Sequence, residues 1–225
     1  MASDPQKDKY SQISPEIQIL VDEFFTMQCR YQAAIREVQT KLEILDNEFQ
    51  SKHRRNPIHH MQCRMKSIPS IIEKLQRKGL PVSMEAAAQN LTDIAGIRVI
   101  CSYIDDIYLI AELLTRQDDV RVVKRRDYIQ HPKENGYRSL HLVLEIPVFL
   151  QDGKTFIPVE VQIRTIAMDF WASLEHTLRY KGITQIPEDI SEALHVAAME
   201  IQSLDERMQA IHNRVDKLAA ESKEA

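Results

Sequence analysis

The chain has 225 residues, of which 44% are hydrophobic and 28% are charged, as in a folded protein of one large or two small domains. No run reaches the roughly 20 apolar residues of a membrane-spanning helix, and the first residues, MASDPQKDKYSQ, lack the apolar core of a secretory signal. Three widely spaced cysteines without a CxxC pair argue against a disulfide framework or a zinc site and predict a cytoplasmic protein.

The net charge of −4 is unevenly distributed along the chain. Residues 52–78 carry eight Lys/Arg and one acid, residues 121–138 carry six and two, and residues 185–225 carry four Lys/Arg and nine acids. An acidic protein with two basic segments is unsuited to coating DNA and better suited to a local anionic ligand. The alternative is that the basic runs are solvated helix faces, which are common on protein surfaces.

Helical patterns open the chain. Residues 1–14 are expected to be disordered, and apolar residues at helical spacing then predict a long helix over 15–50. The pattern breaks over 51–63, where Asn56-Pro57 predicts a turn. A second helix is expected over 67–78, because Gly79 provides a C-terminal stop signal.

The middle of the chain combines strands and helices. Strands are predicted over 94–101, 120–129, 139–148 and 155–165, and helices over 105–116 and 165–181, the last ending at Gly182. Asp152-Gly153 separates the last two strands, which predicts a β-hairpin. Helices followed by a mixed β/α core and further helices predict an α+β domain around one sheet.

The C-terminal segment carries apolar residues at alternating spacings of three and four. They are Leu194, Ala197, Ile201, Leu204, Met208, Ile211, Val215 and Leu218. Such a stripe prefers a helical partner. The sequence leaves open whether that partner is the N-terminal helix or another subunit, and a helix packed on its own domain is the simpler alternative.

Cationic side chains are the candidates for holding phosphate. The chain has only five glycines and neither a GxxxxGK[ST] nor a GxGxxG motif, so a glycine-rich phosphate cradle is not expected. The predicted second helix places Lys74 and Arg77 on one face, in line with Lys66. Arg64 lies two residues before Lys66. Several cations on one face repel one another unless an anion joins them, and a solvated cationic face is again the alternative.

The strand predicted over 155–165 has a polar face. Glu160, Gln162 and Arg164 alternate with apolar residues, so they form either a solvated surface or the floor of a site. In a site, the Glu160 carboxylate would hold Mg²⁺ or accept a proton. Asp93 precedes a buried strand, and two carboxylates together with nucleotide phosphates are a usual Mg²⁺ site. Spacing in the sequence does not establish that Asp93 and Glu160 meet.

Four segments resemble one known family. They are RMKS at 64–67, LTDIAGIRVIC at 91–101, KENGYRSLHL at 133–142 and VEVQIRTIAMDFWASLEH at 159–176. In this order they resemble the synthetase domain of the RelA/SpoT family, and the short chain with flanking helices resembles a stand-alone small alarmone synthetase. The resemblance implies a nucleotidyltransferase-like mixed sheet in a domain over 15–185. It also implies that a helical extension over 186–225 joins subunits into a homotetramer.

The same resemblance implies an activity and the residues that carry it. The activity is the Mg²⁺-dependent transfer of pyrophosphate from ATP to the 3′-hydroxyl of GDP or GTP, which yields (p)ppGpp and AMP. The residues that match ATP contacts are Arg64, Lys66, Lys74, Arg77 and Arg98. Those that match contacts to the guanine nucleotide are Arg126, Lys133, Tyr137, His141 and Gln162, with Tyr137 stacking on guanine. The matching catalytic and Mg²⁺-binding carboxylates are Asp93 and Glu160.

Three alternatives stay open. Some members of the family place pyrophosphate on tRNA, and the basic segments at 52–78 and 121–138 would suit RNA as well as free nucleotide. A non-catalytic nucleotide or RNA sensor on the same fold would have no chemical need for both Asp93 and Glu160. A helical scaffold with an incidental sheet conflicts with the polar face of the strand at 155–165. No membrane or DNA partner is expected.

Overall fold

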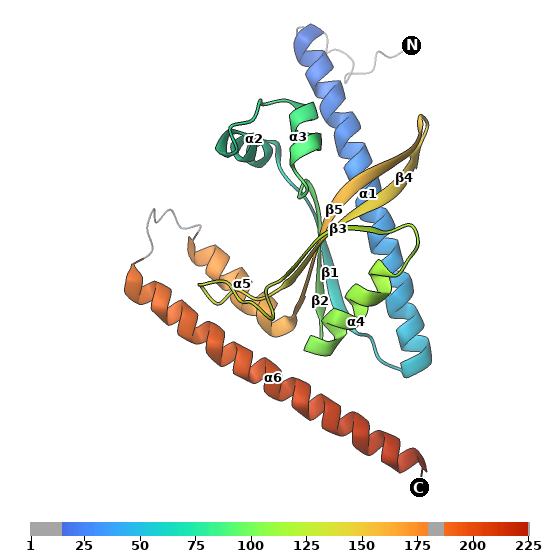
Figure 1. The fold of residues 1–225 in the computed structure, drawn as a ribbon, viewed down its shortest axis with the longest axis vertical. Helices are drawn as coiled ribbons and strands as arrows, with labels where there is room; N and C mark the ends of the chain where they lie inside the picture. Colours follow the sequence, from blue (N-terminus) through green and yellow to red (C-terminus); the bar gives the residue numbers. More distant parts are fainter. Residues whose placement is uncertain (1–14, 180–186, 225) are drawn as a thin grey trace, which may run out of the picture.

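The described residues form one mixed sheet of five strands. The computed structural model describes residues 15–179 and 187–224 (Figure 1). The strands are β1 (Ile58–Met65), β2 (Ala95–Cys101), β3 (Arg121–Asp127), β4 (Leu140–Leu150) and β5 (Gly153–Thr165), and their spatial order is β1-β2-β5-β4-β3. The β2–β5 pair is parallel and the other neighbouring pairs are antiparallel. The prediction of an α+β fold around one mixed sheet is confirmed.

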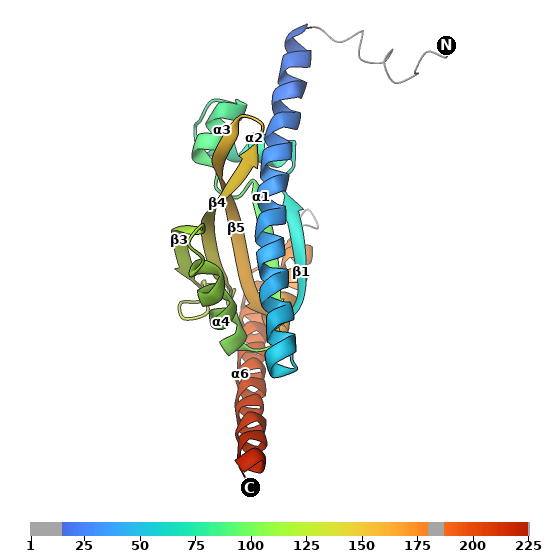
Figure 2. The same ribbon diagram turned by 90° about the vertical axis from the view of Figure 1, so that its right-hand side faces the viewer.

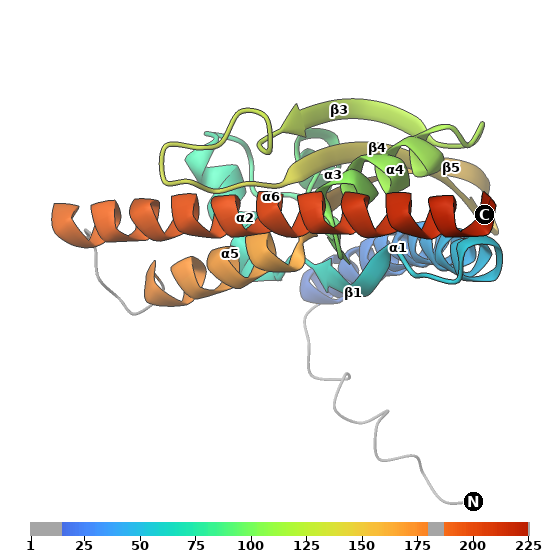
Figure 3. The same ribbon diagram turned by 90° about the horizontal axis from the view of Figure 1, so that it is seen from below.

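Helices lie on both faces of this sheet. They are α1 (Pro15–His53), α2 (Ile68–Arg77), α3 (Met84–Asn90), α4 (Ile104–Thr115), α5 (Ile166–Arg179) and α6 (Glu188–Glu224). Figure 1 views the sheet nearly edge on, with α1 and α4 on one side and α5 on the other, and Figure 2 shows α1 lying along the strands. Seen from below, α6 runs as a long rod past α5 and α4 (Figure 3). The sheet is therefore the middle layer of the molecule.

The hydrophobic core lies between the sheet and α1. The residues that α1 buries follow helical spacing and are Met27, Tyr31, Ala34, Ile35, Val38 and Leu42. The strands β4 and β5 present alternate apolar residues to them, including Leu140, Leu142, Leu144, Val159, Val161 and Ile163. Because successive strand residues point to opposite faces, the polar residues between them face away from α1. The polar face of the predicted strand at 155–165 is confirmed in this way.

The β4–β5 hairpin is confirmed as well. Leu150 pairs with Gly153, so the two strands are joined by a tight turn. Gly153 has φ of +108°, a backbone conformation that a residue with a Cβ rarely adopts. The glycine is therefore what allows the turn at Asp152-Gly153.

Two elements were not expected from the sequence. The strand β1 was not predicted; it begins just after the turn predicted at Asn56-Pro57, and its opening residues IHH are not typical of a buried strand. It is an edge strand with only Ile58 buried, and its pairing with β2 holds it in place. The short helix α3 begins at Ser83, whose side-chain oxygen accepts a hydrogen bond from the backbone N–H of Ala86 at 3.0 Å.

The predicted C-terminal stripe divides between two environments. Leu194, Ala197 and Ile201 pack against Trp171 on α5, so for this half the simpler alternative of packing on its own domain is correct. The second half is about half exposed and comprises Leu204, Met208, Ile211, Val215 and Leu218. Within the described residues, α6 packs mainly on α5 and α4 and not on α1.

Two expectations lie outside the described residues, namely the disorder of residues 1–14 and the helix stop at Gly182. In the part of the chain that the structure describes, every helix is too short or too polar to cross a membrane.

Candidate active site

The register of the sheet places one polar residue from each strand in a single row. Gln62 of β1 pairs with Arg98 of β2, and Arg98 pairs with Gln162 of β5. Gln162 pairs in turn with His141 of β4, and His141 with Arg126 of β3. Residues in register share a face of the sheet, and this face is opposite the α1 core. Strands that are distant in sequence thus bring four of the predicted site residues onto one surface.

A second row lies beside the first. Arg64 pairs with Gly96, and Gly96 pairs with Glu160. Because Gly96 has no side chain, the space above it is open between the Arg64 and Glu160 side chains. The parallel pairing of β2 with β5 is therefore what brings the predicted ATP-binding arginine to the same place as the predicted catalytic carboxylate.

A cleft of about 360 Å³ opens over β1, β2 and β5. Its lining includes the predicted residues Arg64, Lys66, Asp93, Arg98, Glu160 and Gln162. We call it the donor cleft, since it gathers most of the residues expected to contact ATP. The sequence could not establish that Asp93 and Glu160 meet, and the structure places both in the lining of this cleft.

Two lysines hold Asp93 in the donor cleft. The Lys66 ammonium lies 2.8 Å from Asp93 Oδ2, and the Lys74 ammonium reaches the same oxygen at 2.6 Å from α2. Burial raises the pKa of the Asp93 carboxyl, but the hydrogen bonds and charges of the two lysines outweigh this and hold it below its ordinary value. The carboxylate is therefore ionised at neutral pH.

A second cleft of about 560 Å³ lies over β4, β5 and α5. We call it the acceptor cleft; its lining includes the predicted residues Lys133, Tyr137, His141 and Gln162. The two clefts share a wall made of Arg64, Arg98, Gln162 and His176. They are therefore adjoining compartments of one site.

A tight turn presents Tyr137 to the acceptor cleft. The N–H of Gly136 donates to the Lys133 carbonyl at 2.8 Å, and the N–H of Tyr137 donates to Asn135 Oδ1 at 3.2 Å. Gly136 has φ of +86°, which only glycine adopts readily. The Asn135-Gly136 pair thus reverses the chain just before Tyr137.

Aromatic rings and a cation gather around that turn. The Lys133 ammonium lies 4.6 Å from the ring centre of Tyr137 and 4.8 Å from that of Tyr128. The Tyr128 ring meets the His141 ring edge to face, with centres 5.2 Å apart. Tyr128 was not singled out from the sequence, because it sits next to a polar edge strand and only the fold brings it to the other rings.

Glu160 connects the two clefts. Its Oε1 lies 3.3 Å from His141 Nδ1, and its Oε2 accepts a hydrogen bond from Gln162 Nε2 at 3.0 Å. Burial raises the pKa of the Glu160 carboxyl, but the hydrogen bond and charge of His141, with help from Gln162, hold it below its ordinary value. A carboxylate that lines the donor cleft is thus bonded to two residues of the acceptor cleft.

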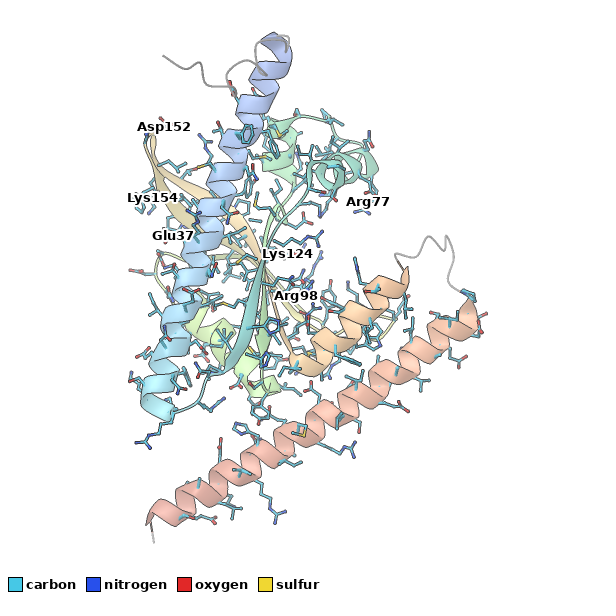
Figure 4. The ribbon with its side chains drawn as sticks, turned by 180° about the vertical axis from the view of Figure 1, so that it is seen from behind. Glu37, Arg77, Arg98, Lys124, Asp152 and Lys154 are labelled. Carbon is cyan, nitrogen blue, oxygen red and sulfur yellow. The ribbon has the colours of Figure 1, made fainter. Side chains whose placement is uncertain are left out.

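Three predicted residues are absent from both linings, and one of them, Lys74, bonds to a lining residue, Asp93. Arg77 is exposed at the C-terminal end of α2, and Arg126 is exposed on the edge strand β3 beside His141. Figure 4 shows Arg77 on α2, away from Arg98 on the sheet. Their predicted phosphate contacts stay predictions, and each would have to reach an extended ligand from outside the cleft.

Residues that sequence reasoning missed support the shared wall. Arg164 is buried and pairs with Asp169 of α5 at 2.6 Å, while Arg98 lies 3.9 Å from the same carboxylate. Burial lowers the pKa of the Arg164 guanidinium. The sequence signal was the position of Arg164 on the polar face of its strand, but its partner lies on the following helix and only the fold reveals it.

The donor cleft also fits a divalent cation. Asp93 Oδ1 is buried and has no hydrogen-bond partner among the described residues, while Oδ2 is held by the two lysines. Glu160 lines the same cleft, and its pKa responds to the charge of Asp93. Hard oxygen ligands of this kind suit Mg²⁺, which usually takes one or two carboxylates and completes its shell with water and phosphate.

Two polar clefts that meet at one carboxylate define a site for transfer of a charged group between two substrates. Comparison with known proteins agrees. The profile of the family described as "Region found in RelA / SpoT proteins" matches residues 63–185. GTP pyrophosphokinase YwaC of Bacillus subtilis is 46% identical over 83% of this chain and 89% of its own length, and GTP pyrophosphokinase YjbM of the same organism is 38% identical over 84% and 89%.

Solved structures give the same result. Small alarmone synthetase 1 from Bacillus subtilis, bound to its product pppGpp, superposes with a TM-score of 0.76 at 39% identity over 82% of this chain and 94% of its own. Small alarmone synthetase 2 from the same organism gives 0.78 at 43% identity over 85% and 99%. The chain belongs to the RelA/SpoT family.

Proposed function

We propose that the chain is a GTP pyrophosphokinase that transfers pyrophosphate from ATP to the 3′-hydroxyl of GDP or GTP and so produces (p)ppGpp and AMP. The observation that carries the proposal is the position of Glu160, which lines the donor cleft with Asp93 and is bonded to His141 and Gln162 of the acceptor cleft. The names of the most similar relatives, GTP pyrophosphokinases and small alarmone synthetases, support the same activity.

The reaction joins the two clefts through one bond exchange. The 3′-oxygen of the guanine nucleotide attacks the β-phosphorus of ATP, the bond from that phosphorus to the oxygen bridging it to the α-phosphorus breaks, and AMP leaves. The hydroxyl proton passes to the Glu160 carboxylate, which is ionised at neutral pH because its pKa is lowered. The in-line approach requires both nucleotides to be held in place, which is the main contribution of the adjoining clefts.

Cationic side chains stabilise the transferred group. A pyrophosphoryl group in transit spreads negative charge over its non-bridging oxygens, so fixed positive charges lower the barrier. Arg64 and Lys66 line the donor cleft, and Lys74 reaches into it through Asp93. Arg98 suits the adenine ring as well as phosphate, since a flat guanidinium both stacks and donates. Asp93 and Glu160 would hold Mg²⁺, which when bound neutralises charge on the phosphates.

The acceptor cleft suits a guanine nucleotide. Tyr137 lines this cleft with the Lys133 ammonium over its ring, and base-to-ring stacking at this position would contribute about 1–3 kcal/mol. Lys133 and His141 lie beside the ring, and Arg126 lies one strand further out, where the 5′-phosphates would extend.

RNA is the second candidate acceptor. The edge strand β3 exposes Arg121, Lys124, Arg125 and Arg126 next to the acceptor cleft. An exposed basic strand would follow a phosphate backbone as well as a nucleotide's phosphates. The identity of the acceptor is therefore the first property to determine.

The working form of the enzyme is cytoplasmic and homotetrameric. Free thiols at Cys29, Cys63 and Cys101 are consistent with a reducing compartment. The exposed apolar half of α6 is a continuous stripe that a second copy of the chain would cover.

Product analysis tests the proposed activity. Purified protein with Mg²⁺ and ATP is expected to release AMP only when GDP or GTP is added. AMP release without an acceptor, or no AMP release with any acceptor, would discard the proposal; the second result would favour a non-catalytic sensor.

A further inference from the structure

The C-terminal helix α6 lies directly against the turn that carries Tyr137. The residues of α6 that face this turn and α5 include Leu194, Ala197, Ala198, Ile201 and Asp205. Figure 3 shows α6 passing along the loop between β3 and β4 and along α5. Because that loop, residues 128–139, has no regular secondary structure, its conformation depends on what packs against it.

The closest approach is between Gly136 and Ala198. A Cβ built on Gly136 would lie 2.4 Å from the Cβ of Ala198, a separation that real Cβ atoms do not reach. Ala198 is itself buried, with an exposed fraction of 6%. Glycine is therefore required at position 136 for two reasons: the backbone has a positive φ, and Ala198 occupies the space that a Cβ would need.

An apolar cluster continues the contact to the functional ring. Tyr137 packs against the buried cluster of Trp171 and Ala172 of α5 and Ala198 of α6, and Leu194, Ala197 and Ile201 of α6 pack against the same cluster. The Trp171 Nε1–H donates a hydrogen bond to the Leu194 carbonyl at 3.0 Å, which fixes α6 to α5. One side of Tyr137 thus rests on the two helices, while the residue also lines the acceptor cleft.

A buried polar group fixes the next turn of α6. Thr165 at the end of β5 donates from its hydroxyl to Asp205 Oδ2 at 2.8 Å. Burial raises the pKa of the Asp205 carboxyl, which is 6% exposed, while the Thr165 hydroxyl and the charge of Arg138, 8% exposed, act in the opposite direction. Arg138 and Asp205 line one small cavity between the turn and α6. The chain is held to α6 on both sides of Tyr137.

We propose that α6 is a positioning element for the guanine-nucleotide site, with Ala198 as its central contact. The inference rests on the proposed function. By holding residues 133–138 in one conformation before substrate arrives, α6 removes the ordering cost that acceptor binding would otherwise carry. The donor cleft contains no residue of α6, so ATP binding does not depend on this contact.

The substitution Ala198→Leu tests the proposal, with Ala220→Leu at an exposed position near the end of α6 as its control. A leucine at 198 would push the turn away from its position. The KM for GDP or GTP is expected to rise about tenfold or more, since this corresponds to losing the order of one or two side chains, while the KM for ATP stays within about twofold. The control variant is expected to have the same KM for the guanine nucleotide and the same KM for ATP as the wild type.

Trp171 provides a readout that does not need turnover. It is the only tryptophan of the chain and belongs to the cluster around Tyr137. Titration of its fluorescence with GDP, without ATP, is expected to show the same loss of acceptor affinity in Ala198→Leu. Equal changes in both KM values, or an unchanged acceptor affinity, would overturn the positioning role.

A pair of variants covers the case in which Ala198→Leu fails to fold. Gly136→Ala introduces the Cβ that meets Ala198, and the added Ala198→Gly substitution removes the atom that it meets. The double variant is expected to recover part of the acceptor affinity that Gly136→Ala loses, the remainder being the strain of positive φ. No recovery would contradict the proposed contact. If the wild type releases no AMP at all, the proposed function is wrong. The fluorescence titrations would then test the contact between Gly136 and Ala198 on their own.

Discussion

The Tyr137 hydroxyl lies 2.9 Å from Nε2 of His141. The opposite nitrogen of that imidazole, Nδ1, lies 3.3 Å from the Glu160 carboxylate. A ring expected to hold the guanine base is thus connected, through one histidine, to the carboxylate expected to receive the 3′-hydroxyl proton. Acceptor binding and chemistry are therefore adjacent parts of one hydrogen-bonded group.

Removing the Tyr137 ring is expected to weaken the acceptor and spare ATP. Tyr137→Ala should raise the KM for GDP or GTP by about 5- to 150-fold, which corresponds to the roughly 1–3 kcal/mol of base stacking. Tyr137→Phe keeps the ring and should lose much less. Steady-state kinetics with each substrate varied in turn measure both effects, and equal increases for ATP and acceptor would remove Tyr137 from the guanine site.

Neutralising Glu160 is expected to stop the reaction without unfolding the protein. Glu160→Gln keeps the size of the side chain but cannot accept the hydroxyl proton, so kcat should fall by at least about 100-fold, the usual contribution of a general base. Circular dichroism and the thermal midpoint should stay close to those of the wild type. Turnover near the normal rate in this variant would show that Glu160 does not have its assigned role.

Asp93 is expected to give the protein a pH-dependent stability. Its folded pKa is held below its ordinary value, so its contribution to the free energy of unfolding is present above the unfolded pKa of about 3.9 and is lost as pH falls. Asp93→Asn should therefore lower the free energy of unfolding by roughly 1–3 kcal/mol at pH 7, the range for hydrogen bonds to charged groups. The difference should shrink below about pH 4.

Urea unfolding of both proteins across that pH range is the measurement. Asp118→Asn, at an exposed position on the opposite side of the core, is the control and should change stability little. A difference between wild type and Asp93→Asn that stays constant with pH would contradict the account of how Lys66 and Lys74 hold this carboxylate.

The exposed half of α6 is expected to join subunits. Met208→Asp together with Ile211→Asp places charge in the middle of the exposed stripe and should convert the proposed tetramer to smaller species. Ala220→Asp, on the opposite side of the helix, is the matched control and should leave assembly unchanged. Sedimentation velocity measures the size of the wild type and of both variants. A wild type that sediments as a monomer would contradict the proposed assembly.

Local patterns predicted much of the fold and part of the site. The alternation in β5 placed Glu160 and Gln162 on the face away from the core, as the structure has them. The meeting of Asp93 with Glu160 could not be predicted from the sequence, because it depends on the parallel pairing of β2 with β5. Two strands that are far apart in the sequence do not by themselves indicate the register in which they pair.

The features that were not predicted are an exposed edge strand and contacts between segments that are far apart in the sequence. The strand β1 was not predicted, although it carries Arg64, because an edge strand that is exposed on most of its length has only a weak apolar pattern. The helix stripe at the C-terminus was read as one surface, but its first half covers Trp171 and the Tyr137 turn. The need for Gly136 to face Ala198 appears only once α6 is in place.

The identity of the acceptor tests the central claim most directly. The enzyme, with Mg²⁺ and ATP labelled on its γ-phosphate, is offered GDP, GTP, GMP and tRNA separately and together, and each acceptor is recovered and counted. The account predicts label on GDP and GTP, in amounts equal to the AMP released, and little on tRNA. Label that accumulates on tRNA while the guanine nucleotides stay unlabelled would contradict it.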